Sequence, residues 1–383
     1  MSTQSRLSFV LMTALLTSSC GDSPLRDAEL LSAQGNLRTC PNCPPEEYSN
    51  GTGVNIGYTG APDYSYYGFY MPDGRRWYLT GFTNLTDLSG NLSVRATGWY
   101  NVAPDSVAAA DASIPAATYK GVTHTVQRIT TGKGTTLSVS LRNPSSGSTI
   151  TVSGQDLLGI VLRIQVPSYT ATGTYPYYLR IHNTALPVSG TTFQDVNGYH
   201  FSYMSSEAGI PTWTNYCNHG AESTDIPAVL YQGSQWNPLT GARTDTSTRV
   251  ALTCRTGAIA QCMAWGYRPW ATATNTSTAQ IESLRNAHQA CIHMKRASYC
   301  GDSHQYTHDG VEIGINDQYG GAISPMVTPL GLIEAEWSTS GATCLSTTRL
   351  LSPAFPGCAN PLPSCPAQLS STAVLRSSVA QQQ

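Results

Sequence analysis

Charged side chains are scarce in this 383-residue chain, making up 11% of it against about 25% in an average soluble protein. The net charge is only −2 and no basic stripe is present, which argues against nucleic acid as a partner. No apolar run beyond the N-terminal segment is long enough for a transmembrane helix. Hydrophobic residues nevertheless make up 40% of the chain, so it can bury a core and wholesale disorder is excluded.

The familiar catalytic motifs are also missing. The sequence has no Gly-x-Ser-x-Gly elbow, no His-Glu-x-x-His pair, no phosphate-binding loop and no dinucleotide-binding fingerprint. Because each of these motifs carries a particular chemistry, their absence favours a binding or structural protein over an enzyme. No organic cofactor is predicted either.

The residues at the N-terminus have the pattern of an export signal. Arg6 precedes an apolar stretch from Leu7 to Leu16, which is too short to span a bilayer. Small residues then lead to Cys20, the arrangement of a bacterial lipoprotein signal. We therefore expect residues 1–20 to be the signal peptide and Cys20 to carry lipid, which would hold the protein on a membrane. An ordinary secretory signal cut nearby is the alternative.

Cysteine usage agrees with export. Eleven cysteines less Cys20 leave ten, an even number that predicts up to five disulfides in an oxidising compartment. The sequence does not fix their pairing, although the close spacing of the first two favours a local bond between them. The candidates are Cys40, Cys43, Cys217, Cys254, Cys262, Cys291, Cys300, Cys344, Cys358 and Cys365.

The fold is predicted to be mainly β. Segments such as Leu92–Ala96, Thr136–Leu141 and Gly159–Val166 alternate or concentrate apolar residues between turn-forming clusters, which is typical of short antiparallel strands. We expect residues 21–47 to be a tether, 48–153 a domain resembling an antiparallel β-sandwich, 154–350 an α+β domain and 351–383 a Pro- and Ser-rich tail.

One helix stands out in the C-terminal half. Ile281, Leu284, His288 and Cys291 recur at helical spacing, which predicts a helix capped by Ser277 or Thr278. We expect it to end near residue 297, and its buried cysteine to anchor it to the sheet.

Several short motifs recur in order between about residues 154 and 349. They are Trp213, Tyr216-Cys217, Trp265-Gly266-Tyr267-Arg268-Pro269-Trp270, His288-Gln289-Ala290-Cys291, Ala297-Ser298-Tyr299-Cys300-Gly301 and Glu334-Ala335-Glu336-Trp337. Together they resemble the bacterial ADYC-domain proteins, a family named for Ala-Asp-Tyr-Cys, and this chain has Ser298 in place of the Asp. The resemblance implies a secreted or lipid-anchored protein and carries no known activity.

Two functional hypotheses follow. The favoured one is an exported protein, lipid-anchored to a bacterial membrane at its periplasmic face or at the cell surface. It would act as a binding or structural module whose ligand is an unidentified protein or glycan. In this hypothesis the lipid is the only membrane contact. The alternative is a metal-dependent extracytoplasmic hydrolase, with a divalent metal held by His304, His308 and Asp309, because two imidazoles and a carboxylate are a plausible ligand set.

Overall fold

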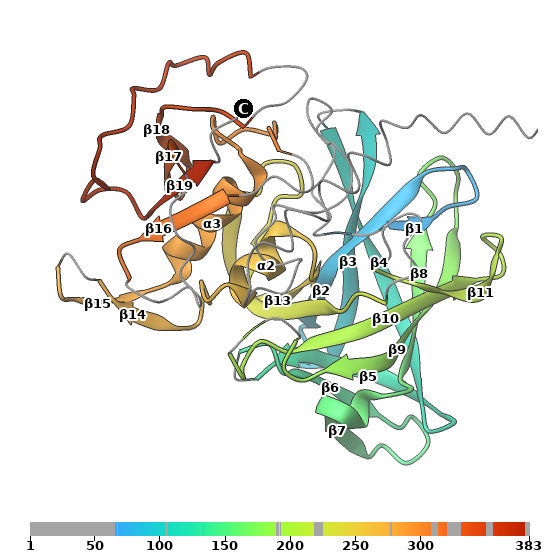
Figure 1. Cartoon of the computed structure of the whole chain (residues 1–383). Helices are drawn as coiled ribbons and strands as arrows, with labels where there is room; N and C mark the ends of the chain where they lie inside the picture. The colour runs from blue at the N-terminus through green and yellow to red at the C-terminus, as the bar shows by residue number, and fades with distance from the viewer. Residues whose placement is uncertain are drawn as a thin grey trace, which may run out of the picture.

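The structure is a computed structural model that describes residues 66, 68–103, 106–132, 134–188, 191, 193–217, 225–275, 278–307, 313–319, 331–349 and 355–379. Within these ranges the chain is mostly antiparallel β, as the sequence predicts, and most of its strands join one large sheet (Figure 1).

Eight long strands pair in a closed ring. Each neighbour is antiparallel, and the last strand, β13, pairs back onto the first, β2. The ring strands, in order, are β2 (Arg76–Thr86), β3 (Leu92–Ala103), β4 (Ser106–Tyr119), β8 (Val161–Pro167), β9 (Thr174–Ala185), β10 (Gly198–Ser205), β12 (Ala228–Trp236) and β13 (Arg243–Cys254).

Shorter elements extend this sheet. β5 continues from β4 and leads to β6 and β7, while β1 pairs with β2 and β11 with β10. Their bounds are β1 (Gly68–Tyr70), β5 (Val122–Thr131), β6 (Leu137–Arg142), β7 (Thr149–Ser153), β11 (Ile210–Asn215) and the 3-10 helix η1 (Gly154–Leu157).

Strand alternation builds two cores from one sheet. In β8, Leu162, Ile164 and Val166 are buried in the first cluster, which fills the ring. In β12, Leu230 belongs to that cluster, whereas its neighbour Val229 belongs to a second cluster on the outer face. Because successive side chains point to opposite faces, β12 is buried on both sides. The C-terminal region therefore packs against the outside of the ring at this strand.

That C-terminal region contains α2 and α3, the α-helices of the described residues, and two small sheets. Figure 1 shows α2, α3 and the four-stranded sheet β16–β19 together on the β13 side of the ring. The elements are α2 (Ala258–Ala264), α3 (Arg285–Arg296), β14 (Thr272–Thr274), β15 (Ile281–Ser283), β16 (Ile313–Asp317), β17 (Leu332–Ser338), β18 (Gly341–Leu345) and β19 (Leu375–Val379). In the described part of the chain, no helix has the length and apolar character needed to cross a membrane.

The helices differ in detail from the sequence prediction. Ile281 is in the short strand β15 and is 75% exposed, so α3 begins later, at Arg285. It ends at Arg296, with Ala297 in the left-handed conformation at its C-cap. The second helix, α2, was not predicted. Cys291 is bonded to Cys262 of α2 rather than to the sheet, so the two helices are tied to each other.

Candidate metal centre

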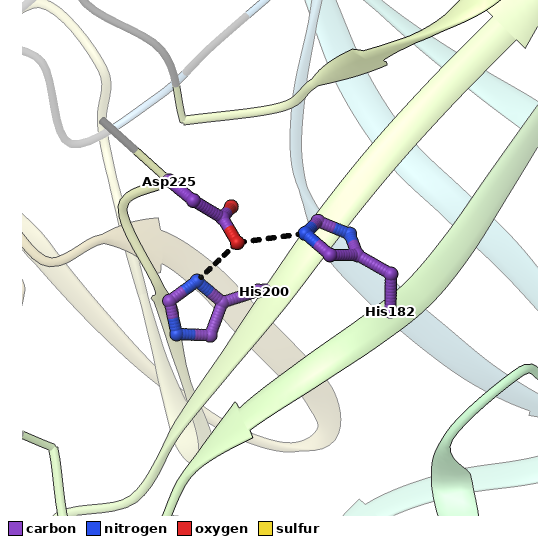
Figure 2. A group of neighbouring side chains, drawn as sticks. All are labelled: His182, His200 and Asp225. Carbon is purple, nitrogen blue, oxygen red and sulfur yellow. Dashed lines mark hydrogen bonds and ion pairs between the residues drawn. The ribbon is translucent and has the colours of Figure 1, made fainter. Parts of the chain in front are cut away.

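Two histidines and an aspartate converge on the outer face of the ring. His182 is in β9, His200 is in β10, and Asp225 lies three residues before β12 (Figure 2). One carboxylate oxygen of Asp225, Oδ2, lies 2.8 Å from His182 Nε2 and 3.0 Å from His200 Nδ1. One ligand atom from each of the three side chains lies within 4.8 Å of the others. The side chains are 21%, 12% and 32% exposed, so the cluster is partly open to solvent.

The sheet itself explains why the two imidazoles meet. Ile181 and Phe201 are paired across the strands and buried inside the ring, so their sequence neighbours His182 and His200 point outward. His200 pairs with Asn183, which leaves His182 as the extra residue of a β-bulge in β9. Bulges re-aim a side chain, and this one turns His182 toward its neighbour on β10.

Asp225 comes from a different part of the chain. Before it in the sequence, the disulfide between Cys217 and Cys254 joins the chain just after β11 to the end of β13. After it, Ala228 enters the ring as the first residue of β12 and pairs with Tyr199, the residue next to His200. The pairing of Ala228 with Tyr199 therefore places the carboxylate of Asp225, three residues earlier, beside the histidines.

Hydrogen bonds satisfy only some of the polar atoms in this cluster. His182 Nε2 and Asp225 Oδ2 form a hydrogen bond. His200 Nδ1 is close to the same oxygen but lies outside hydrogen-bond geometry, and it is buried without another partner. The second carboxylate oxygen, Oδ1, and His182 Nδ1 are also buried and unpartnered. Each such atom costs about 1–3 kcal/mol unless something else satisfies it. An ion between His182 Nε2, His200 Nδ1 and Asp225 Oδ2 would satisfy His200 Nδ1, whereas His182 Nδ1 is on the far side of its ring.

The residue types and spacing fit a transition-metal ion. Imidazole nitrogens and carboxylate oxygens are the ligands that zinc and neighbouring metals prefer. A tetrahedral zinc site holds adjacent ligand atoms about 3.3 Å apart, given zinc–ligand bonds of about 2.0–2.1 Å. The two nitrogen–oxygen distances fall slightly short of this, so the ligands would separate by a few tenths of an ångström on binding. Three protein ligands would leave coordination positions open, as catalytic sites do.

The set predicted from the sequence is elsewhere. His304 follows α3 in a loop, is 36% exposed, and places Nδ1 3.3 Å from Asp302 Oδ2. Its ring also stacks on Tyr306, with centroids 6.4 Å apart. The other two predicted ligands, His308 and Asp309, lie outside the described residues, so that site stays a prediction.

The two histidines of α3 are structural. His288 is fully buried, and its Nε2 lies 3.0 Å from the carbonyl oxygen of Ile259 in α2. Burial lowers the pKa of His288 to about 3 and that of His293 to about 4. Both are therefore neutral at physiological pH and serve the packing of the helix.

Eight of the ten predicted disulfide cysteines are bonded in pairs. The pairs are Cys217–Cys254, Cys262–Cys291, Cys300–Cys358 and Cys344–Cys365. Cys20, Cys40 and Cys43 lie outside the described residues. Four disulfides in one chain are consistent with an extracytoplasmic protein, because reducing compartments keep thiols free.

The Ala297–Cys300 motif also has structural roles. Ala297 caps α3, and the hydroxyl of the buried Ser298 donates to the carbonyl oxygen of Asp302 at 3.2 Å. Tyr299 donates from its hydroxyl to Glu334 Oε1 at 2.8 Å, and Cys300 is disulfide-bonded. Gly301 follows with φ +69°, where a Cβ atom would meet a backbone oxygen at 1.9 Å. The motif therefore connects the end of α3 to β17 and the loop beyond it.

Fold and site together define a disulfide-linked antiparallel β protein with a two-histidine, one-carboxylate cluster on the outside of its sheet. The family model of the ADYC domain matches residues 154–351, just over half of the chain, and the chain belongs to this family. The matched segment includes His182, His200 and Asp225. No curated protein and no solved structure matches the chain.

Proposed function

We propose that this chain is an exported, lipid-anchored protein whose ADYC domain binds one transition-metal ion of the zinc class through His182, His200 and Asp225. The observation that carries the proposal is the convergence of His182 Nε2, His200 Nδ1 and one carboxylate oxygen of Asp225, with His200 Nδ1 buried and satisfied by no hydrogen bond. A hydrogen-bonded triad without metal would explain His182 Nε2 but would leave His200 Nδ1 facing a carboxylate in poor geometry.

The first test is zinc content. The oxidised ectodomain from Gly21 onward is dialysed against zinc, desalted and assayed by elemental analysis. We expect one zinc per chain, lost in His182→Ala, His200→Ala and Asp225→Asn and retained in His304→Ala. A zinc-free wild type would overturn the proposal. Loss in His304→Ala alone would move the metal to the ligand set predicted from the sequence.

Thermal unfolding supplies a second readout that does not depend on retention during desalting. A ligand that binds only the folded state stabilises it by about 2.7 kcal/mol when present at one hundred times its Kd. Zinc should therefore raise the unfolding temperature of the wild type and leave that of His200→Ala unchanged. Equal shifts in both proteins would indicate adventitious zinc binding.

A metal-dependent hydrolase is the second candidate function. It is favoured by the count of three protein ligands and by their partial exposure, since catalytic zinc sites keep a position for water or substrate. We would screen the zinc-loaded wild type, with the zinc-free variant Asp225→Asn as the control, against ester, amide and phosphoester substrates. Turnover by the wild type alone would support an enzyme, whereas no turnover by the fully zinc-loaded protein would favour a binding module.

The lipid anchor has its own test. Cys20→Ser should release the full-length protein from the membrane fraction, and mass spectrometry of the wild type should find acyl chains on Cys20. A wild type found in the soluble fraction with an unmodified Cys20 would favour the ordinary secretory signal instead.

A further inference from the structure

Beside the candidate metal centre, the same sheet face carries a second pair of polar residues. Arg180 lies two residues before His182 in β9, and Ser202 lies two residues after His200 in β10. Arg180 and Ser202 are directly paired across the strands. Residues two apart in a strand share a face and lie about 7 Å apart, so the four side chains form one outward-facing patch.

Arg180 is held in place but lacks a partner for its charge. Its guanidinium stacks over the ring of Trp213 in β11 at 4.3 Å. Its Nε is buried without a hydrogen-bond partner, and no carboxylate in the described part of the chain pairs with it. Arg268 provides a comparison, since it also stacks on an aromatic ring and has an unpartnered Nε, yet its Nη1 pairs with the carboxylate of Asp195. A stacked guanidinium with free donors is prepared to receive a planar or multi-oxygen anion.

Ser202 also has a buried polar atom without a hydrogen-bond partner. Its side chain is 2% exposed, and its hydroxyl oxygen is buried without any hydrogen-bond partner. A hydroxyl loses hydrogen bonds to water on burial, so an unpaired one costs stability unless a ligand restores the bond. Arg180 and Ser202 therefore offer donors on one side of the candidate metal centre, where the described chain supplies no acceptor.

The positive charges of the metal centre and of Arg180 indicate that the ligand is an anion. A divalent ion with two neutral imidazoles and one aspartate leaves a net charge of about +1 at the centre, and the neighbouring arginine adds another. We infer that this patch binds an oxyanion, a carboxylate or phosphate group whose one oxygen completes the metal coordination while another accepts from Arg180 and Ser202. The inference rests on the proposed metal site, and it specifies the class of ligand that the site would take.

The test separates the two proposals. Zinc content is measured first on wild type, Arg180→Gln and Arg163→Gln. Arg163 is the matched control, because it is an exposed arginine of β8 that faces outward beside Tyr178 of β9 and is further from the cluster. Acetate and inorganic phosphate are then titrated into each zinc-loaded protein by calorimetry. Parallel titrations into the cobalt-substituted proteins follow the visible spectrum, which reports anions that coordinate the metal.

We expect the wild type and Arg163→Gln to bind at least one probe equally and to change the cobalt spectrum. Arg180→Gln should hold the same zinc but bind the anion at least tenfold more weakly, and Ser202→Ala should weaken it severalfold. Preference for acetate identifies a carboxylate ligand, and preference for phosphate a phosphoryl group. Full zinc loading with equal anion affinity in all variants would overturn this inference alone, whereas absence of zinc would remove the metal site itself.

Discussion

The strand ring and the C-terminal region, residues 255–379, are stabilised by different means. The ring has long strands, continuous backbone pairing and an interior filled by alternating apolar residues. The C-terminal region has short strands, and many of its polar and charged side chains are buried. Of the four disulfides in the described residues, three lie wholly within it. Where regular pairing is sparse, this chain relies on covalent links and buried ion pairs.

The pair between Glu334 and Arg349 is the clearest example. Both side chains are fully buried and joined by two contacts of 2.7 and 3.1 Å. Arg349 also donates to the carbonyl oxygens of Met294 and Lys295 at the end of α3. One side chain therefore satisfies an acidic partner and the open carbonyls of a helix terminus together.

Breaking this pair should give the largest effect. Arg349→Met leaves Glu334 buried without its counter-ion, and we expect a loss of about 3–5 kcal/mol in the stability of the C-terminal region. Hydrogen exchange should rise in α3 and β17 and stay low in β8 and β9. As a control, the double variant Glu334→Leu, Arg349→Met should recover part of the loss, because two apolar residues leave no isolated charge. A loss under 1 kcal/mol in the single variant would contradict the argument.

Removing a disulfide should come next. The bond between Cys300 and Cys358 spans 58 residues, and its replacement by two alanines should cost about 2–4 kcal/mol. The matched pair Cys344–Cys365 spans 21 residues, so its loss should cost about 1 kcal/mol less in the chain-entropy account. Denaturant titration of the two double variants measures the difference. Equal or reversed costs would show that native contacts, rather than loop length, set the value of each bond.

Sequence reasoning found what local patterns encode. Period-two alternation predicted the β class, and an even cysteine count predicted disulfides. It did less well on helices, because Ile281 fits the helical spacing yet pairs in a short hairpin with Thr274. The helix α2 gave no signal, since all seven residues of Ala258–Ala264 are buried and no polar face marks its period.

The candidate metal centre lay beyond such reasoning. His182 and His200 are brought together by strand register and a bulge, which depend on the whole sheet rather than on spacing along the chain. No recognisable motif near Asp225 in the sequence marks it as a ligand. Residues 199–203 alternate as a strand does, but nothing in that alternation identifies the neighbouring strand. Closure of the ring was equally hidden, because it depends on the pairing of β13 with β2.

Acid should also act mainly on the C-terminal region. Burial lowers the pKa of His288 to about 3 and that of His293 to about 4, below the value of about 6.5 in an unfolded chain. The unfolded state therefore takes up protons first as the pH falls. The free energy of unfolding is therefore highest above about pH 6.5 and falls progressively below that pH. At pH 5 each histidine should have cost about 2 kcal/mol relative to pH 7.

Hydrogen exchange at the two pH values, corrected for intrinsic rates, measures this. We expect protection in α2 and α3 to fall before protection in β8 and β9. His288→Gln should have lower stability at pH 7 but a shallower dependence on pH, because it removes one of the two titrating groups. A pH dependence unchanged by this substitution would show that other groups control the acid response.

The smallest expected effect comes from a substitution in the ring. It tests whether the stability of the C-terminal region depends on that of the ring. Ile164 is fully buried inside the ring, in β8, so Ile164→Val should cost about 0.5–1.5 kcal/mol. The second core includes Val229 and Tyr231 of β12, so the C-terminal region needs the ring as a surface to pack on. A loss of about 1 kcal/mol should therefore speed exchange about fivefold in the most protected amides of both regions. Arg349→Met, in contrast, should speed it only in the C-terminal region. If Ile164→Val left α3 unchanged, the two regions would unfold independently, and the second core would contribute less to their coupling than its burial indicates.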